Sequence, residues 1–263
     1  MAYEIIELWE NTPDFHPEYN QPHPNLEVHP VENPRGCMVV IPGGGYEWVS
    51  FEHEGRKLAK HFTAKGYYVY ILTYRCKPYH HPCQQMDVNR AVRWARYRAK
   101  ECGYDANKIG VIGFYAGGHL AMTACTKFDE GIAGDEIDAV SCRPDLGVLC
   151  YGVLTLGTPH TEWGTTRHLL GEEFDPALAH SLSAEGAVRP DMPPCFIWHT
   201  AEDSLVPVQK SLDFAKALHS VGVPYELHVF PIGRHGLSLA EEDPHVARWA
   251  ELLEEFMCIL WKI

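Results

Sequence analysis

The sequence predicts an α/β protein with a mostly parallel central sheet and helices on both of its faces. Short apolar runs, typical of buried strands, alternate along the chain with longer segments whose apolar residues recur every three or four positions. Several of these runs end in loops rich in glycine or polar residues, which is where ligand-binding groups lie in an open α/β sheet. The 263 residues can bury one full core, so we expect a single domain over 1–263.

The predicted elements alternate after an irregular, proline-rich segment at 11–36, which holds a short strand near 26–29. Strands are expected at 37–41, 67–74, 109–114, 146–151, 195–199 and 225–230. Helices are expected at about 54–65, 87–99, 120–124, 207–220 and 246–260. The long connection at about 153–190 has little periodicity, so we expect a lid or substrate-binding cap there.

Composition and charge exclude several classes of function. The formal net charge of −13 argues against binding to nucleic acid and to an anionic membrane surface. The first ten residues carry three glutamates and show no signal peptide, and no apolar run is long enough to span a bilayer. The nine cysteines lack CxxC spacing, which favours reduced thiols. We therefore expect a cytoplasmic protein without a membrane partner.

The segment at 108–119 has the layout of a nucleophile elbow, in which a buried strand breaks sharply into a helix. Gly113 and Gly117 occupy the glycine positions of the G-x-S-x-G pattern, where a larger side chain would collide with the turn. The centre of the pattern is Tyr115 instead of serine. An ordinary strand–turn–helix junction also contains such glycines, so the assignment depends on other stretches of the chain.

A run of glycines follows the strand at 37–41. In the segment 42–45, Pro-Gly-Gly-Gly, the backbone can turn its N–H groups toward a ligand without interference from side chains. The amides of Gly44 and Gly45, together with that of Ala116 after the elbow, are therefore candidates for an oxyanion hole. The alternative is a flexible tight turn.

Candidates for an orienting carboxylate and a base follow the last two strands. Asp203 lies in the loop after 195–199, with Glu202 as a local competitor, although an acidic residue there can also cap the next helix. His235 lies in the glycine-flanked loop after 225–230, which suits a general base. The order elbow, Asp203, His235 along the chain is that of α/β-hydrolases and differs from those of chymotrypsin-like and subtilisin-like proteases.

With these motifs the chain resembles an α/β-hydrolase of the esterase/lipase group and is similar to the bacterial acetyl-xylan-esterase-like carbohydrate esterases. The likeness covers nearly the whole chain from about residue 37, and its most specific segments are 42–46, 112–121, 193–203 and 228–236. It implies removal of short acyl groups, typically acetyl, from xylan-type carbohydrates by a nucleophile–His–Asp mechanism, with no metal or organic cofactor. It gives Asp203 and His235 the acid and base places. The nucleophile place falls on Tyr115, where the family has serine.

The tyrosine leaves three explanations open. A phenol reaches several atoms beyond a serine hydroxyl, and its reference pKa of about 10 keeps it protonated at neutral pH. In the first explanation Tyr115 replaces serine in an engineered or variant chain, and an intact esterase scaffold has little activity. In the second the chain is a natural non-catalytic relative that binds a saccharide or another partner. In the third it is an active enzyme with an unusual nucleophile. A peptidase or formamidase on the same scaffold also stays open.

Aromatic and histidine side chains near these loops are candidates for a saccharide site. The alternative, which the sequence favours equally, is that they pack in the interior of the protein. Those near the glycine turn and in the long connection are Tyr46, Trp48, His160 and Trp163. His80 and His81 are weak metal candidates, because no carboxylate lies beside them and a proline follows, which favours a solvated loop. The expected ligand is therefore a small-molecule or oligosaccharide ester, without a metal.

Overall fold

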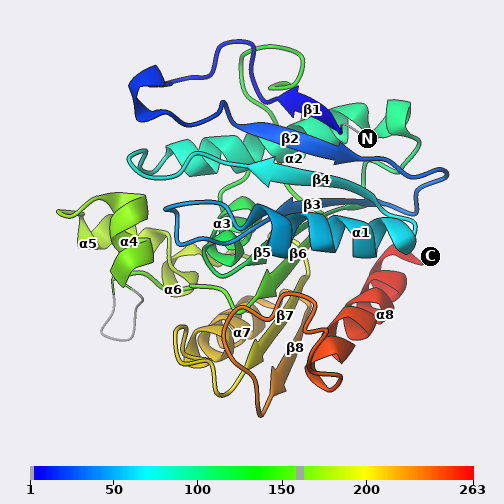
Figure 1. Cartoon of the computed structure of the whole chain (residues 1–263), viewed down its shortest axis with the longest axis vertical. Helices are drawn as coiled ribbons and strands as arrows, with labels where there is room; N and C mark the ends of the chain where they lie inside the picture. Colours follow the sequence, from blue (N-terminus) through cyan, green and yellow to red (C-terminus); the bar gives the residue numbers. More distant parts are fainter. Residues whose placement is uncertain (1–2, 158–162) are drawn as a thin grey trace.

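The computed structural model describes residues 3–157 and 163–263, and their strands form one eight-stranded sheet (Figure 1). The strand order is β1-β2-β4-β3-β5-β6-β7-β8. The pairs from β4 to β8 are parallel, and β1 and β2 form an antiparallel edge, so the predicted fold class is confirmed. The strands are β1 (Glu4–Glu7), β2 (Asn25–His29), β3 (Cys37–Ile41), β4 (Tyr68–Thr73), β5 (Ile109–Phe114), β6 (Leu146–Cys150), β7 (Cys195–Thr200) and β8 (Tyr225–Phe230).

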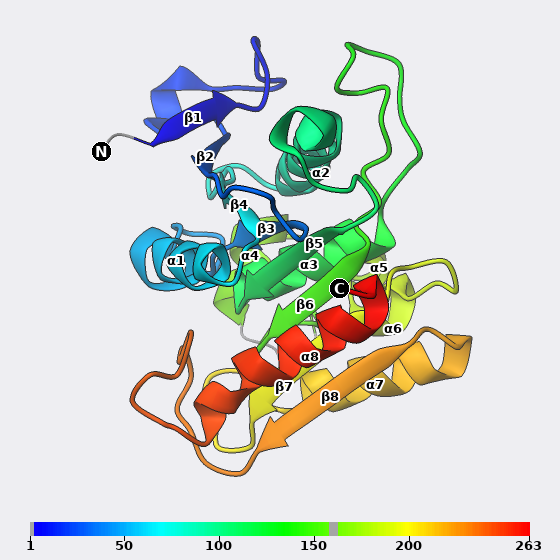
Figure 2. The ribbon, with the colours of Figure 1, turned by 90° about the vertical axis from the view of Figure 1, so that its right-hand side faces the viewer.

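Helices cover both faces of the sheet (Figure 2). One face carries α1 (Lys57–Ala64) and α8 (Trp249–Trp261), and the other carries α2 (Cys83–Cys102), α3 (Ala116–Thr126) and α7 (Gln209–Val221). Within the described ranges, no helix combines the length and apolar character needed to cross a bilayer. The shorter elements are α4 (Trp163–Leu170), α5 (Pro176–Ser181), α6 (Ala184–Ala187) and the turns η1 (Pro17–Tyr19), η2 (Phe51–Arg56) and η3 (Val246–Arg248).

The core lies in two layers, one on each side of the sheet. Along β3, Val39 and Ile41 belong to the layer under α2 and α3, while Met38 and Val40 belong to the layer under α1 and α8. All five residues of β3 are buried. A parallel strand covered on both faces has no polar side, which explains the continuous apolar runs in the sequence.

Some elements differ from the predicted ones. The helix expected from residue 54 begins as a π-helical turn, η2, before it continues as α1. α2 begins earlier than expected, directly after Pro82, and ends where Gly103 takes a left-handed φ of 82°. The sequence does not predict β1, because its residues, Glu-Ile-Ile-Glu, are mostly exposed at the sheet edge. The connection at 153–190 contains α4, α5 and α6.

β5 breaks into α3 within one residue, and close packing requires the two glycines beside the break. A Cβ atom added at Gly113 would lie well inside 3.0 Å of the Gly117 carbonyl oxygen. One added at Gly117 would lie equally close to the carbonyl oxygen of Ile41, at the end of β3. A larger side chain at either position would have to push α3 away from the sheet.

Gly117→Ala is expected to lower the free energy of unfolding by about 2–3 kcal/mol, because the added methyl group meets only backbone atoms. Gly222→Ala is the control: its Cβ meets no atom within 4 Å, but its φ of 75° should cost about 1 kcal/mol. Urea unfolding of both variants measures the difference. Equal midpoints for the two variants would contradict the close approach of α3 to β3.

Candidate active site

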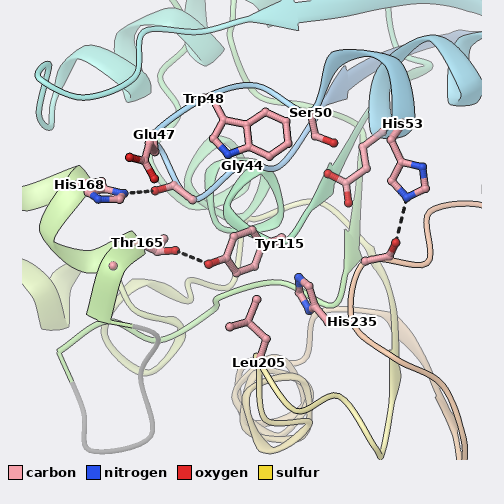
Figure 3. Close-up of a pocket in the computed structure, with 14 residues that line it drawn as sticks. Gly44, Glu47, Trp48, Ser50, His53, Tyr115, Thr165, His168, Leu205 and His235 are labelled. Atoms are coloured by element: carbon pink, nitrogen blue, oxygen red, sulfur yellow. Dashed lines mark hydrogen bonds between the residues drawn. The ribbon is translucent and has the colours of Figure 1, made fainter.

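Tyr115 is the single residue between β5 and α3, and it has the strained backbone expected of an elbow. Its φ of 53° and ψ of −114° lie outside the regions that residues with side chains ordinarily adopt. Two hydrogen bonds of 3.1 Å hold this conformation: Tyr115 N–H donates to the Cys150 carbonyl, and the Tyr115 carbonyl accepts from Val153 N–H. The end of β6 thus fixes the backbone at 115, and the side chain lines the pocket beside it (Figure 3).

Asp203 and His235, far apart in the sequence, are in contact beside Tyr115. His235 Nδ1 lies 2.7 Å from Asp203 Oδ2. The other carboxylate oxygen accepts the N–H groups of Leu205 at 2.9 Å and Val206 at 2.8 Å. The Asp203 side chain is fully buried, while that of His235 keeps 18% of its surface exposed. The imidazole therefore borders the pocket, and the carboxylate lies behind it.

A second imidazole supports the same carboxylate. His199 Nε2 lies 3.3 Å from Asp203 Oδ2 and 2.9 Å from the Val206 carbonyl. Burial acts to raise the pKa of the Asp203 carboxyl, but the hydrogen bonds from His199, from His235 and from Val206 N–H outweigh it and hold that pKa well below its ordinary value. Asp203 is therefore ionised at neutral pH and able to orient the imidazole. The competitor Glu202 is exposed.

The Tyr115 ring lies against the imidazole of His235. Their ring centroids are 4.8 Å apart at an interplanar angle of 79°, which is an edge-to-face contact. The phenol oxygen accepts a hydrogen bond from the Thr165 hydroxyl at 3.0 Å. It also lies beside Gly45, where an added Cβ would be 3.7 Å from it. Figure 3 shows the hydroxyl directed toward Thr165 and away from His235.

The glycine turn takes backbone conformations that few other residues adopt. Gly44 has a φ of 123° and Gly45 a φ of 65°, and a Cβ at Gly44 would collide with the carbonyl of Trp48. Within the part of the chain that the structure describes, the N–H groups of Gly44, Gly45 and Ala116 donate to no protein acceptor. These amides are therefore available to a ligand, whereas the N–H of Gly43 donates to Glu54 Oε2 at 2.9 Å.

These groups surround a pocket of about 360 Å³ (Figure 3). Its walls come from the glycine turn, the π-helical turn η2, α4 and the loops after β7 and β8. Trp48 is 59% exposed, so its indole is accessible to a ligand. The predicted residues that line the pocket are Gly44, Gly45, Trp48, Tyr115 and His235.

Other predicted ligand contacts lie elsewhere. Tyr46 has a left-handed φ of 57° after the glycines, and its side chain is fully buried in the core, where the hydroxyl lies 2.8 Å from His119 Nδ1. The expectation that Tyr46 contacts substrate is therefore wrong. Trp163 begins α4, is 43% exposed and packs near Phe174, and it is not among the pocket-lining residues that the structure describes. His160 lies outside the described residues.

The sequence does not predict several residues that line the pocket. Thr165 and His168 come from α4, and His168 Nδ1 must donate its hydrogen to the Gly45 carbonyl, 2.8 Å away, because a carbonyl only accepts. No motif marks these two residues in a stretch without periodicity. Glu54 lies within the segment expected to be an ordinary helix. The other unpredicted lining residues are Glu47, Ser50, His53, Gly164, Leu205 and Gly236.

Two of the proteins to which the chain is similar have names that refer to xylan or xylanase activity. The chain is 37% identical over 228 residues to endo-1,4-beta-xylanase B of Butyrivibrio fibrisolvens, an alignment that covers 84% of this chain and 35% of the relative. It is 30% identical over 210 residues to the acetylxylan esterase of Xylanibacter ruminicola, covering 78% of this chain and 42% of the relative. The chain thus spans less than half the length of these two relatives.

The fold and its loops also match a solved structure. The crystal structure of the acetyl ester-xyloside bifunctional hydrolase from Caldicellulosiruptor lactoaceticus is 43% identical in sequence, with a TM-score of 0.92 over 96% of this chain and 94% of that chain. The family model described as BD-FAE matches residues 28–218, which include the glycine turn, Tyr115 and Asp203. The chain therefore belongs to the BD-FAE family.

Proposed function

We propose that this chain has the scaffold of an esterase that deacetylates xylan-type carbohydrate esters, and that Tyr115 stands in the place of the nucleophilic serine and leaves the chain nearly inactive. In this scheme His235 is the general base and Asp203 orients it. The amides of Gly44, Gly45 and Ala116 donate to the oxyanion. The mechanism uses only these side chains and backbone groups.

The proposal depends on the position of the phenol oxygen. A nucleophile must lie within reach of both the base and the oxyanion donors. The Tyr115 hydroxyl is instead bonded to Thr165 and lies against Gly45, beyond the imidazole. It therefore lies beside the turn that would donate to the oxyanion. In this proposal the ring, in edge contact with His235, fills the space that an acetyl group needs.

The choice of a carbohydrate ester rests on the pocket and on the relatives. The exposed indole of Trp48 offers a flat apolar surface on which a sugar ring can pack. The relatives from X. ruminicola and C. lactoaceticus have names that refer to acetylxylan and to acetyl esters and xylosides. A non-catalytic saccharide-binding protein would use the same pocket, and a peptidase or formamidase would use the same base.

Tyr115→Ser is expected to raise kcat/KM for a short-chain aryl acetate by on the order of 10³-fold or more, because loss of a triad nucleophile costs several orders of magnitude in such enzymes. Release of the aryl alcohol measures the rate. Release of acetate from acetylated xylo-oligosaccharides is measured in parallel. Comparison of this rate with the rates of hydrolysis of an aryl formamide and a peptide anilide tests the preference for a carbohydrate ester.

Two further variants give this experiment its controls. Tyr115→Phe removes only the hydroxyl and should be as inactive as the parent chain, and His235→Ala should abolish the activity gained with Tyr115→Ser. An active parent that loses activity in Tyr115→Phe and carries an acyl group on Tyr115 by mass spectrometry would make the phenol the nucleophile. If Tyr115→Ser gains nothing while saccharide binding persists, the chain is a binding protein.

Asp203→Asn is expected to lower stability in a pH-dependent way. Because the pKa of Asp203 is lower in the folded chain than its ordinary value of about 3.9, the carboxylate stabilises the fold above about pH 4, and this contribution is lost as the pH falls further. Urea unfolding of parent and variant should therefore show a difference that is constant above about pH 5 and shrinks toward about pH 3. A difference that does not change with pH would mean that Asp203 is not held as an anion.

A further inference from the structure

A buried carboxylate borders the pocket but has no role in the proposed chemistry. Glu54 is 4% exposed. Its Oε2 accepts the N–H of Gly43 at 2.9 Å, and its Oε1 accepts the hydroxyl hydrogen of Tyr151 at 2.7 Å. Burial raises the pKa of Tyr151 well above its ordinary value, so this hydroxyl keeps its proton and donates it. Each oxygen of Glu54 therefore satisfies one donor from a different loop.

The Tyr151 hydroxyl extends this connection to the loop that carries His235. It accepts the N–H of Ser238 at 3.0 Å, three positions after the imidazole. The Tyr151 ring also packs edge-to-face on His235, with centroids 5.1 Å apart. A continuous chain of hydrogen bonds thus runs from Gly43 through Glu54 and Tyr151 to Ser238, and so joins the glycine turn to the His235 loop.

The π-helical turn η2 makes two more contacts with the same loop. His53 Nε2 donates to the Gly236 carbonyl at 2.9 Å, as Figure 3 shows. The Ser238 hydroxyl donates to the His53 carbonyl at 2.7 Å. Turns of this wide form are frequent at functional sites. The side chain and the carbonyl of His53 thereby hold the loop at Gly236 and at Ser238.

We infer that Glu54 is a positioning residue, which fixes the oxyanion-donating turn at a set distance from the imidazole of His235; the inference rests on the proposed esterase function. Hydrolysis needs both groups in place at once, and a displacement of about 1 Å between them can cost on the order of 10²-fold in rate. A fully satisfied buried network gives that rigidity. In the proposed mechanism Glu54 neither attacks the acyl carbon nor transfers a proton, and it acts through its hydrogen bonds with Gly43 and Tyr151.

The test uses Glu54→Gln in the Tyr115→Ser background. Glutamine has nearly the same volume but only one acceptor oxygen, so either Gly43 N–H or the Tyr151 hydroxyl loses its partner. We expect kcat for an aryl acetate to fall about 10- to 100-fold with KM changed less than about threefold. Tyr151→Phe should also lower kcat. The activation free energy added by the double variant should be smaller than the sum of those added by the two single variants, because both residues belong to one chain of hydrogen bonds.

Asp145→Asn is the matched control. This carboxylate also accepts a backbone N–H, that of Ile109 at 3.1 Å, and a side-chain donor, Arg96 at 2.9 Å. It precedes β6, at the opposite end of the sheet from the pocket. Its loss should lower stability without changing kcat. An unchanged kcat in Glu54→Gln, in an active Tyr115→Ser background, would overturn the positioning role and leave the esterase function intact.

A second measurement does not depend on activity. Amide hydrogen exchange of the parent chain should become faster in Glu54→Gln at both 43–45 and 233–238, and in neither segment in Asp145→Asn. If Tyr115→Ser has no esterase activity, the proposed function fails, and the exchange rates still decide whether Glu54 joins the two segments. Unchanged exchange at these segments would overturn the inference.

Discussion

The close approach of α3 to the carboxyl end of β3 is the constraint on which the whole site depends. Glycine at 117 permits this approach, and glycine at 113 permits the packing of α3 on β5. Gly43 also lies close, since a Cβ there would be 3.1 Å from the Cβ of Tyr115. The elbow and the glycine turn therefore touch each other. This contact brings the start of α3, where Ala116 lies at the positive end of the helix dipole, against the glycine turn at Gly43. The proposed oxyanion site therefore depends on backbone packing and not on the side chains given catalytic roles.

Asp203 and the loop of His235, to which the proposed mechanism gives catalytic roles, are held by hydrogen bonds that do not involve residue 115. The carboxylate of Asp203 is fixed by two backbone amides and by His199, and the His235 loop is fixed by η2 and Tyr151. An aromatic residue at the elbow can therefore occupy the centre of the site without dismantling it. The strained backbone at 115 is likewise set by the end of β6. What the side chain changes is the chemistry of the pocket and the space within it.

Much of this arrangement could be predicted from the sequence, because it depends on backbone rules. Three motifs in this order are typical of α/β-hydrolases. They are a glycine run after a strand, a glycine pair around a strand–helix break, and a loop with an acidic residue followed by a loop with a histidine. Tyr46 shows where such rules fail. The neighbouring residues in the sequence do not indicate in which direction a residue with a left-handed backbone points its side chain. In the folded chain the Tyr46 side chain points into the core, where its hydroxyl contacts His119. Glu54 could not be found either, because its partners, Gly43 and Tyr151, are brought to it only by the folded sheet.

Helix α4 shows that the Tyr115 phenol also takes part in holding the structure around the pocket. His168 fastens α4 to the glycine turn through the Gly45 carbonyl, and Thr165 fastens it to the elbow through the Tyr115 hydroxyl. A serine at 115 is several atoms too short to reach Thr165, so the second connection exists only because the residue is a tyrosine. The same side chain thus lines the pocket and ties α4 to the end of β5. Shortening it would open space in the pocket and also remove this hydrogen bond between α4 and the elbow, so one side chain affects both the volume of the pocket and the attachment of its wall.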